Sequence, residues 1–310
     1  MSGDKSHPIL PQRVVLFQNP KAGARSGRPL VGRLESLLQE RGHDVQTTSD
    51  VDQYVELVAS LNQDGDSFCV VAAGGDGTVG LVVNHSQPGT PIAILPLGTE
   101  NLLAKQLGIT ADSELVCRMI CDGELAKIDA GEANGRLFLL MVGCGFDADV
   151  VQRLHRERKG HIHRLSYFKP IFDSVRSYEY PGLRVYCDPP TDEAQAGSSG
   201  EVITAKWAFV VNLPRYAGGL QIAPRAVGDD QLLDVCTFQK GSLLSGLRYL
   251  AGIALGHHEG LAECTTFRVR RLRIESDGEV PYQLDGDPGG TLPVDIRVLP
   301  QRATLLVPRV

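Results

Sequence analysis

The sequence predicts an α/β protein, with an N-terminal three-layer α/β/α nucleotide-binding domain followed by a mainly antiparallel β-sandwich domain. Short apolar runs alternate with amphipathic helical segments in the first third, whereas longer strands joined by turns follow from about residue 127. A glycine-rich loop also ends one of the apolar strands. We therefore divide the chain into residues 1–126 and 127–310, and leave open a return of the last strand to the first domain.

Apolar spacing and turn residues define the elements of the first domain. We expect strands at 13–18, 45–48, 68–73 and 91–96, and helices at 29–41 and 52–61. Strands separated by helices form a parallel sheet that is covered on both faces. The loops at 19–27, 74–78 and 96–101 should then meet at the carboxyl edge of that sheet, where ligands bind.

The second domain has a different pattern. A strand pair at 127–129 and 136–142 precedes a helical region at about 149–178 and a polar, Pro/Gly/Ser-rich loop at 188–200. Further strands are expected at 183–187, 206–211, 232–238, 267–274 and 281–284. Many strands with few helices between them favour an antiparallel sandwich.

Composition narrows the function classes. The chain has 310 residues, 42% hydrophobic and 22% charged, which suffices for two domains with full cores. Its net charge of −6 argues against a nucleic-acid partner. Seven cysteines without a Cys-x-x-Cys pair indicate free thiols, and residues 1–11 lack a signal-peptide core, so we expect a cytoplasmic protein. The sequence does not fix the oligomeric state, and a homodimer is one option.

The loop Gly74-Gly75-Asp76-Gly77-Thr78 carries the clearest chemistry. Glycine has no Cβ, so the backbone of such a loop can approach a phosphate closely, and the following helix adds its positive N-terminal end. A tight turn after an ordinary strand is the alternative interpretation.

Other short motifs follow in order: Asn19-Pro-Lys-Ala-Gly23, Pro96-Leu-Gly-Thr-Glu-Asn101, Asp129-Ala-Gly131, Gly143-Cys-Gly-Phe-Asp-Ala148, Asp229-Asp230 and Asp285-Gly-Asp287. Together with the glycine loop, they resemble the diacylglycerol-kinase-like lipid kinases, which include soluble bacterial diacylglycerol kinases, sphingosine kinases and ceramide kinases. NAD kinases are more distantly similar. The resemblance extends from about residue 13 to residue 308.

This resemblance implies ATP and Mg²⁺ as cofactors and transfer of a phosphoryl group to a lipid hydroxyl. It implies that Asp287 accepts the hydroxyl proton and that Asp76 organises Mg²⁺ and the ATP phosphates. It implies a structural Mg²⁺ at Asp230, completed by the backbone of Val227 and Leu232. The nucleotide-binding residues that it implies are Asn19, Pro20, Lys21, Gly23, Gly74, Gly75, Asp76, Gly77, Thr78, Gly98, Thr99 and Asn101.

The chain departs from the family pattern at a few positions. Gly80-Leu81 stands where Asn-Glu is usual, Leu102 stands where Asp is usual, and Asp287 is one methylene shorter than the usual Glu. Taken alone, Asp285-Gly286 is typical of a hairpin turn, and Asp229-Asp230 of a solvated loop. An NAD-kinase-like enzyme and a non-catalytic nucleotide- or lipid-binding protein are the alternative functions.

A lipid acceptor requires contact with a membrane surface. Residues 153–169 contain six Lys or Arg, namely Arg153, Arg156, Arg158, Lys159, Arg164 and Lys169, interleaved with apolar residues. Such a segment is attracted by anionic headgroups, so we expect peripheral contact there. A solvated helix face is the alternative.

Overall fold

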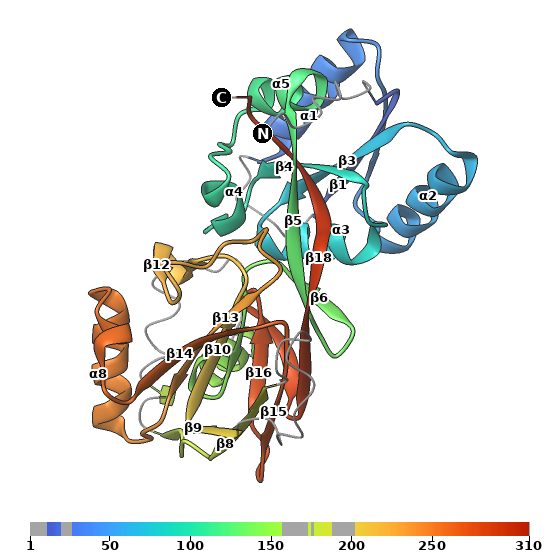
Figure 1. The fold of residues 1–310 in the computed structure, drawn as a ribbon. Helices are drawn as coiled ribbons and strands as arrows, with labels where there is room; N and C mark the ends of the chain where they lie inside the picture. Colours follow the sequence, from blue (N-terminus) through green and yellow to red (C-terminus); the bar gives the residue numbers. More distant parts are fainter. Residues whose placement is uncertain (1–10, 20–26, 157–172, 175–176, 188–201, 310) are drawn as a thin grey trace, which may run out of the picture. The chain divides into compact units, whose positions relative to one another are not determined.

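The computed structural model describes residues 11–19, 27–156, 173–174, 177–187 and 202–309 (Figure 1). The chain divides into two compact units, one comprising residues 1–128 with 302–310 and the other residues 129–301. The sequence-based boundary at 126/127 lies close to this division. Residues 302–310, at the end of the chain, belong to the first unit.

The first unit is built on a mainly parallel sheet. Its strands are β1 (Arg13–Gln18), β2 (Asp44–Thr48), β3 (Phe68–Gly74), β4 (Pro91–Pro96), the first part of β5 (Glu124–Ala133) and the last part of β18 (Val294–Val307). The strand order is β2-β1-β3-β4-β18, with β5 beside β18. The pairs from β2 to β18 are parallel, including Thr304 of β18 with Pro91 of β4. β5 runs antiparallel to β18, because Glu124 lies beside Arg309 and Glu132 beside Arg297.

Helices cover both faces of that sheet. They are α1 (Gly27–Glu40), α2 (Val51–Asp64), α3 (Asp76–His85), α4 (Leu102–Gln106) and α5 (Ser113–Asp122). α1 packs against α5, whereas α2 packs against β1 and α3 against β3. Tyr54 of α2 is hydrogen-bonded to Ser86 at the end of α3, so α1 and α5 lie on one face and α2 and α3 on the other (Figure 1). β3 is buried along its whole length, as a central strand covered on both faces must be.

The second unit is a β-sandwich. One sheet contains β6 (Arg136–Phe138), β8 (Leu183–Cys187), β9 (Val202–Ala205), β15 (Arg271–Ser276) and the parts of β5 and β18 that belong to this unit. The other sheet is antiparallel, in the order β14 (Cys264–Val269), β13 (Leu233–Phe238), β10 (Trp207–Val211), β7 (Met141–Cys144), β16 (Pro281–Leu284) and β17 (Asp287–Thr291). α6 (Phe146–Arg156), α8 (Leu243–Ala254) and the short pair β11 (Arg215–Tyr216) and β12 (Leu220–Gln221) complete the described part.

Strand β10 explains why the antiparallel sheet is apolar on both faces. Ala208 and Val210 enter the core between the two sheets. Trp207 and Phe209 point the other way and contact the ring of Phe238. That ring lies 4.4 Å from the ring of Tyr249 in α8, measured between centroids. The helix thus covers the outer face of the sheet.

Two expected strands are each divided between the two sheets. The segment 267–274 separates into β14 and β15 because the buried residues Val269, Leu272 and Ile274 are spaced by three and then by two positions. An interval of three breaks the alternation of a single strand. In the same way, 136–142 separates into β6 and β7, with Leu139 and Leu140 at the crossing. The polar loop at 188–200 and most of the helical region after 156 lie outside the described residues.

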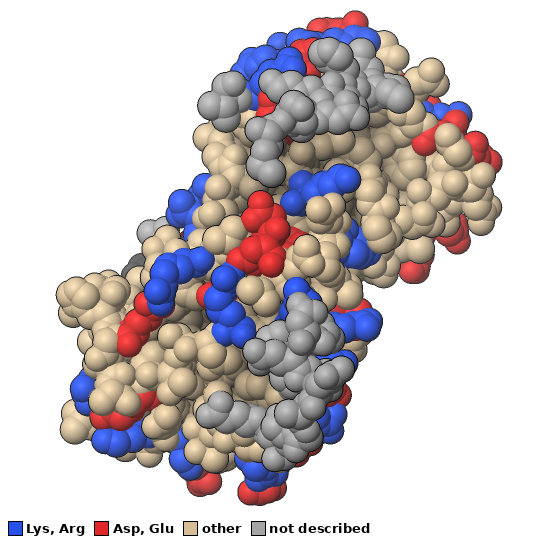
Figure 2. Space-filling model, viewed as in Figure 1, with Lys and Arg blue, Asp and Glu red and all other residues tan. Residues whose placement is uncertain are grey.

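Most charged side chains lie at the surface. Figure 2 shows Lys, Arg, Asp and Glu distributed over the visible face of the described residues. Against this background the buried carboxylates Asp129, Asp147 and Asp149 are unusual, with exposed fractions of 0%, 4% and 8%. Buried charges need bonded partners, so each of these groups marks a constrained part of the fold.

Asp129 joins three distant segments of the second unit. Its carboxylate accepts hydrogen bonds from the backbone N–H of Gln231 (2.6 Å) and Gln301 (2.7 Å). Its own N–H donates to the carbonyl of Gly228 at 2.6 Å, and its carbonyl accepts from Asn212 at 2.9 Å.

We predict that Asp129→Ala lowers the free energy of unfolding of the second unit by about 2–4 kcal/mol, because two backbone donors lose a charged acceptor. Urea denaturation of the full chain measures this. Asp277→Ala is the matched control, because the Asp277 side chain is 87% exposed. Equal midpoints for the two variants would contradict the structural role of Asp129.

Candidate active site

Contacts join three predicted nucleotide loops in the first unit. The side chain of Asn19, after β1, donates to the hydroxyl of Thr78 in α3 at 3.2 Å. The N–H of Leu97, after β4, donates to the carbonyl of Gly74 at 2.8 Å. The loops therefore meet at the carboxyl ends of β1, β3 and β4.

Glycine is required where these loops approach one another. A Cβ on Gly74 would clash with the Thr78 side chain. A Cβ on Gly98 would lie 2.5 Å from the Cα of Gly75 and 2.7 Å from Oδ1 of Asn101. Asn101 closes the third loop, since its side chain accepts from the N–H of Gly98 and donates to the carbonyl of Gly98, both at 2.9 Å. Its φ of 48° is a left-handed conformation that asparagine tolerates.

Asp76 begins α3 and bonds to the start of α4. Its two carboxylate oxygens accept the backbone N–H groups of Leu102 at 2.9 Å and Leu103 at 3.0 Å. Burial raises the pKa of Asp76, and these two hydrogen bonds partly oppose that rise. The carboxylate thus ties the second loop to the third. Its expected part in organising Mg²⁺ stays a prediction.

The departure at Leu102 does not affect this contact, because Asp76 binds the backbone of Leu102 and not its side chain. Gly77 and Thr99 lie in the same two loops. Pro20, Lys21 and Gly23 lie outside the described residues.

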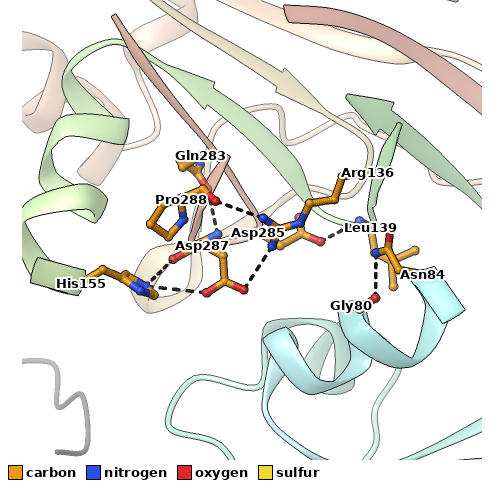
Figure 3. A network of polar contacts seen from close by, with 10 residues as sticks. Gly80, Asn84, Arg136, Leu139, His155, Gln283, Asp285, Asp287 and Pro288 are labelled. Carbon is orange, nitrogen blue, oxygen red and sulfur yellow. Dashed lines mark hydrogen bonds and ion pairs between the residues drawn. The ribbon is translucent and has the colours of Figure 1, made fainter. Parts of the chain in front are cut away.

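In the second unit, Asp285 and Gly286 form a two-residue turn between β16 and β17 (Figure 3). Their φ angles of 50° and 88° are those of the hairpin turn that this dipeptide indicates. The Asp285 carboxylate accepts three consecutive backbone N–H groups, from Leu139 (2.7 Å), Leu140 (2.9 Å) and Met141 (2.8 Å). The turn is therefore fastened to the crossing between β6 and β7.

Asp287 follows the turn and lies between two basic side chains (Figure 3). Arg136 donates to its Oδ2 at 3.5 Å and to the carbonyl of Pro288 at 3.0 Å. Nε2 of His155 lies 3.7 Å from its Oδ1. The Asp287 side chain is 39% exposed, so a ligand can reach it. The sequence analysis missed both Arg136 and His155, since neither belongs to a recognised motif.

A buried hydrogen-bond network supports the same turn. The amide of Gln283 donates to Asp147 at 2.9 Å, and its carbonyl oxygen accepts the N–H of Gly286 at 2.7 Å. Tyr216 also donates to Asp147. Burial raises the pKa of Asp147 to about 7. The motif Gly143–Ala148 contained this residue, but nothing in the sequence indicated its burial.

The predicted metal ligand Asp230 is paired with an arginine. Its Oδ1 accepts the N–H of Leu232 at 3.1 Å, and its Oδ2 accepts from the Arg268 guanidinium. Among the described residues, no three His, Cys, Asp or Glu side chains form a metal-binding group. In this arrangement the Asp230 carboxylate binds the guanidinium of Arg268, and a metal ion would have to displace that guanidinium. The role of Asp230 with Val227 and Leu232 in binding Mg²⁺ stays a prediction.

The fold and the loops define a class of proteins. In this class, an α/β unit with a glycine-rich loop precedes an antiparallel β-sandwich. Residues 13–133 match the family model of the diacylglycerol kinase catalytic domain. Residues 140–307 match that of the YegS C-terminal NAD kinase beta sandwich-like domain. The chain belongs to the diacylglycerol-kinase-like family, as its motifs predicted, and the predicted fold class is confirmed.

Individual relatives agree with this assignment. A diacylglycerol kinase of Mycobacterium tuberculosis is 29% identical over 307 residues, which cover 96% of each protein. An uncharacterized protein of Synechocystis is 25% identical over 278 residues, covering 86% of this chain and only 61% of that protein. The crystal structure of a diacylglycerol kinase from Bacillus anthracis shares the fold with a TM-score of 0.68, at 21% identity over 96% of this chain and 97% of that one. Family membership supports a lipid kinase.

We predict that Gly98→Ala lowers the free energy of unfolding of the first unit by about 1–3 kcal/mol, because the added methyl forces the second and third loops apart. Gly80→Ala is the matched control, since nothing lies within 4 Å of its Cβ position. Because Gly80 lies within helix α3, the Gly80→Ala change should raise the free energy of unfolding by about 0.5–1 kcal/mol. Chemical denaturation of both variants measures the effects, and a Gly98→Ala protein as stable as the wild type would disprove the close approach.

We predict that Asp147→Asn makes the protein more stable than the wild type above pH 7, and that the advantage disappears toward pH 4. The raised pKa of about 7 means that the folded state holds a proton that the unfolded state releases near pH 4. The stability that this proton confers is therefore complete at low pH and is lost as pH rises through about 7. Thermal unfolding of both proteins across this range measures the difference, and a constant difference would contradict the pKa.

Proposed function

We propose that this protein is an ATP-dependent lipid kinase that transfers the γ-phosphoryl group of ATP to the hydroxyl of diacylglycerol or a related lipid. The observation that carries the proposal is the joined set of glycine loops at the N-terminus of α3. The first turn of a helix leaves backbone N–H groups without intrahelical partners, and these groups bind phosphate.

In this proposal, the residues of the glycine-rich loops bind the nucleotide. Backbone groups at 74–78 and 98–101 hold the phosphates, and Thr78 and Asn19 set the spacing of the first two loops. Mg²⁺, which neutralises phosphate charge during phosphoryl transfer, enters with ATP. Asp76 acts in this scheme by holding the second and third loops together, because its two oxygens already accept backbone N–H groups.

The acceptor side of the proposal rests on Asp287. A carboxylate that takes up the proton of the attacking hydroxyl is a recurring part of kinase sites. Asp287 is accessible at 39% exposure, and the Asp285 turn fixes its backbone. The names of the relatives support diacylglycerol as the acceptor class.

We propose peripheral contact with a bilayer as the route to the acceptor. Among the described residues, no helix has the length and apolar character needed to cross a membrane. Of the expected basic segment 153–169, only residues 153–156 are described. There Arg153 is bonded to Asp149 at 2.7 Å, so that guanidinium supports the helix and is not free for headgroups.

The proposal predicts that the protein transfers label from γ-labelled ATP, with Mg²⁺, to one of a panel of micellar lipids: diacylglycerol, sphingosine, ceramide, monoacylglycerol and prenol. Asp287→Ala should lower the rate by about 100-fold or more, because a positioned proton acceptor contributes at least that much. Asp76→Ala should also lose activity, through separation of the loops. Asp277→Ala, a change at an exposed carboxylate, should keep the wild-type rate.

Thermal shift assays separate the alternatives. Stabilisation by Mg·ATP without transfer to any lipid would contradict the kinase and favour a non-catalytic nucleotide-binding protein. Phosphorylation of NAD in place of a lipid would favour the NAD-kinase-like alternative.

A further inference from the structure

Helix α8, drawn in orange in Figure 1, carries a cluster of exposed leucines. Among the described residues, seven large apolar side chains are exposed, and four of them belong to this helix and its C-terminal cap. These four, which we call the leucine face, are Leu243 (50% exposed), Leu244 (78%), Leu247 (49%) and Leu255 (70%). Single exposed apolar residues are ordinary, whereas a group on one helix face marks a contact surface.

Packing on the sheet fixes the outward direction of the leucine face. The buried residues of α8 include Gly246, Tyr249 and Ile253, which lie on the side of the helix opposite the leucines. The ring of Tyr249 packs on Phe238 with 4.4 Å between centroids. A Cβ on Gly246 would clash with the Tyr180 hydroxyl, so the helix lies close against that residue. Turning α8 to bury the leucines would break both of these contacts.

The charge around the leucine face is positive. No Asp or Glu occurs between Gln239 and His258, in a chain whose net charge is −6. Lys240 and Arg248 both bond to the carboxylate of Glu263, at 2.9 Å and 3.2 Å. The side chains of Lys240 and Arg248 are 66% and 55% exposed, whereas that of Glu263 is 13% exposed. Two accessible cations that share one largely buried anion leave positive charge for an anionic partner.

α8 lies on the same side of the antiparallel sheet as α6. Phe146 of α6 packs edge-on against Trp207, which belongs to the outer face that α8 covers. The ring of Tyr180 stacks on Phe146 with 5.9 Å between centroids, and its hydroxyl lies beside α8. α6 also contacts β17, whose first residue is Asp287. A partner of α8 therefore lies on the side of the sheet where α6 meets the segment of the proposed proton acceptor.

These features favour a lipid surface over a second copy of this chain. A stable protein–protein interface takes about 20–30 residues a side. The leucine face offers four leucines on a helix of 12 residues. A bilayer accepts such a small face with basic residues at its edge, because the apolar side chains enter the acyl boundary and the cations meet the headgroups.

We propose that the leucine face of α8 docks on a bilayer that contains anionic lipids. This inference rests on the proposed lipid kinase function, because the acceptor of that reaction lies in a bilayer. It names the surface of the second unit through which the peripheral contact is made.

Sedimentation of the full chain with vesicles of equal parts phosphatidylcholine and phosphatidylglycerol tests this docking. We expect the double variant Leu244→Ser/Leu255→Ser to lower the partition coefficient about 10-fold or more, because the two most exposed leucines no longer enter the acyl boundary. Leu125→Ser is the matched control, since Leu125 is 45% exposed in the first unit and its change should keep wild-type binding. Wild-type partitioning by the double variant would overturn the inference.

Arg248→Gln tests the electrostatic part of the docking, and it leaves Lys240 to pair with Glu263. We expect its binding to fall about 5-fold on the anionic vesicles and to stay unchanged on vesicles of phosphatidylcholine alone. A variant that binds the anionic vesicles as tightly as the wild type would overturn the preference for anionic lipids.

Kinase assays separate a failure of this inference from a failure of the proposed function. The double variant should match the wild-type rate on a short-chain, water-soluble diacylglycerol, and it should be about 10-fold slower on diacylglycerol embedded in the vesicles. Wild-type rates in both formats would overturn the docking and leave the kinase intact. Absence of transfer by the wild type in both formats would refute the proposed function, and sedimentation would still decide on the docking.

Size-exclusion chromatography without lipid tests the other occupant of the leucine face. We expect the wild type and the double variant to elute at the same volume. A wild-type dimer that the double variant converts to a monomer would assign the leucine face to a second copy of this chain and overturn the inference.

Discussion

The candidate site of the second unit depends on one carboxylate, that of Asp285. The chain leaves one sheet after β6 and enters the other at β7, and at this crossing the N–H groups of Leu139 to Met141 bond to a side chain and not to a neighbouring strand. Asp285 accepts all three. Buried amides without partners would cost about 1–3 kcal/mol each, so this one side chain stabilises both the crossing and the turn. The position of Asp287 relative to α6 and β6 follows from it.

The same use of a carboxylate recurs at two other motif positions. Asp76 accepts two backbone N–H groups from the start of α4, and Asp129 accepts two from the segments around 231 and 301. Each of these carboxylates joins segments that are distant in sequence by accepting backbone N–H groups. An acidic residue in a short motif is therefore not by that fact a metal ligand or a base. It can equally be the acceptor that holds a loop in place.

The sequence predicted most of the strands because uniformly apolar runs such as 68–73 have only one stable environment, a sheet covered on both faces. It also predicted which glycine loops meet. It did not predict that 267–274 changes sheets, because that change rests on one irregular interval between buried residues. The partners of Asp287 were missed for a different reason. His155 and Gly286 are separated by 131 positions, and a contact of that span leaves no local pattern.

The departures from the family pattern acquire a physical meaning from these contacts. Leu102 has lost a polar side chain, yet the bond to Asp76 is made by its backbone N–H. Gly80 lies in α3 with open space around its Cβ position, so the contacts between the loops do not require glycine there. By contrast, the family pattern is retained at the residues where the loops approach one another closely, namely Gly74, Thr78 and Gly98. Substitution has thus occurred where side chains are dispensable, and backbone geometry has been preserved where the loops touch. A phosphate site made of backbone N–H groups tolerates such changes, because its donors do not depend on residue type.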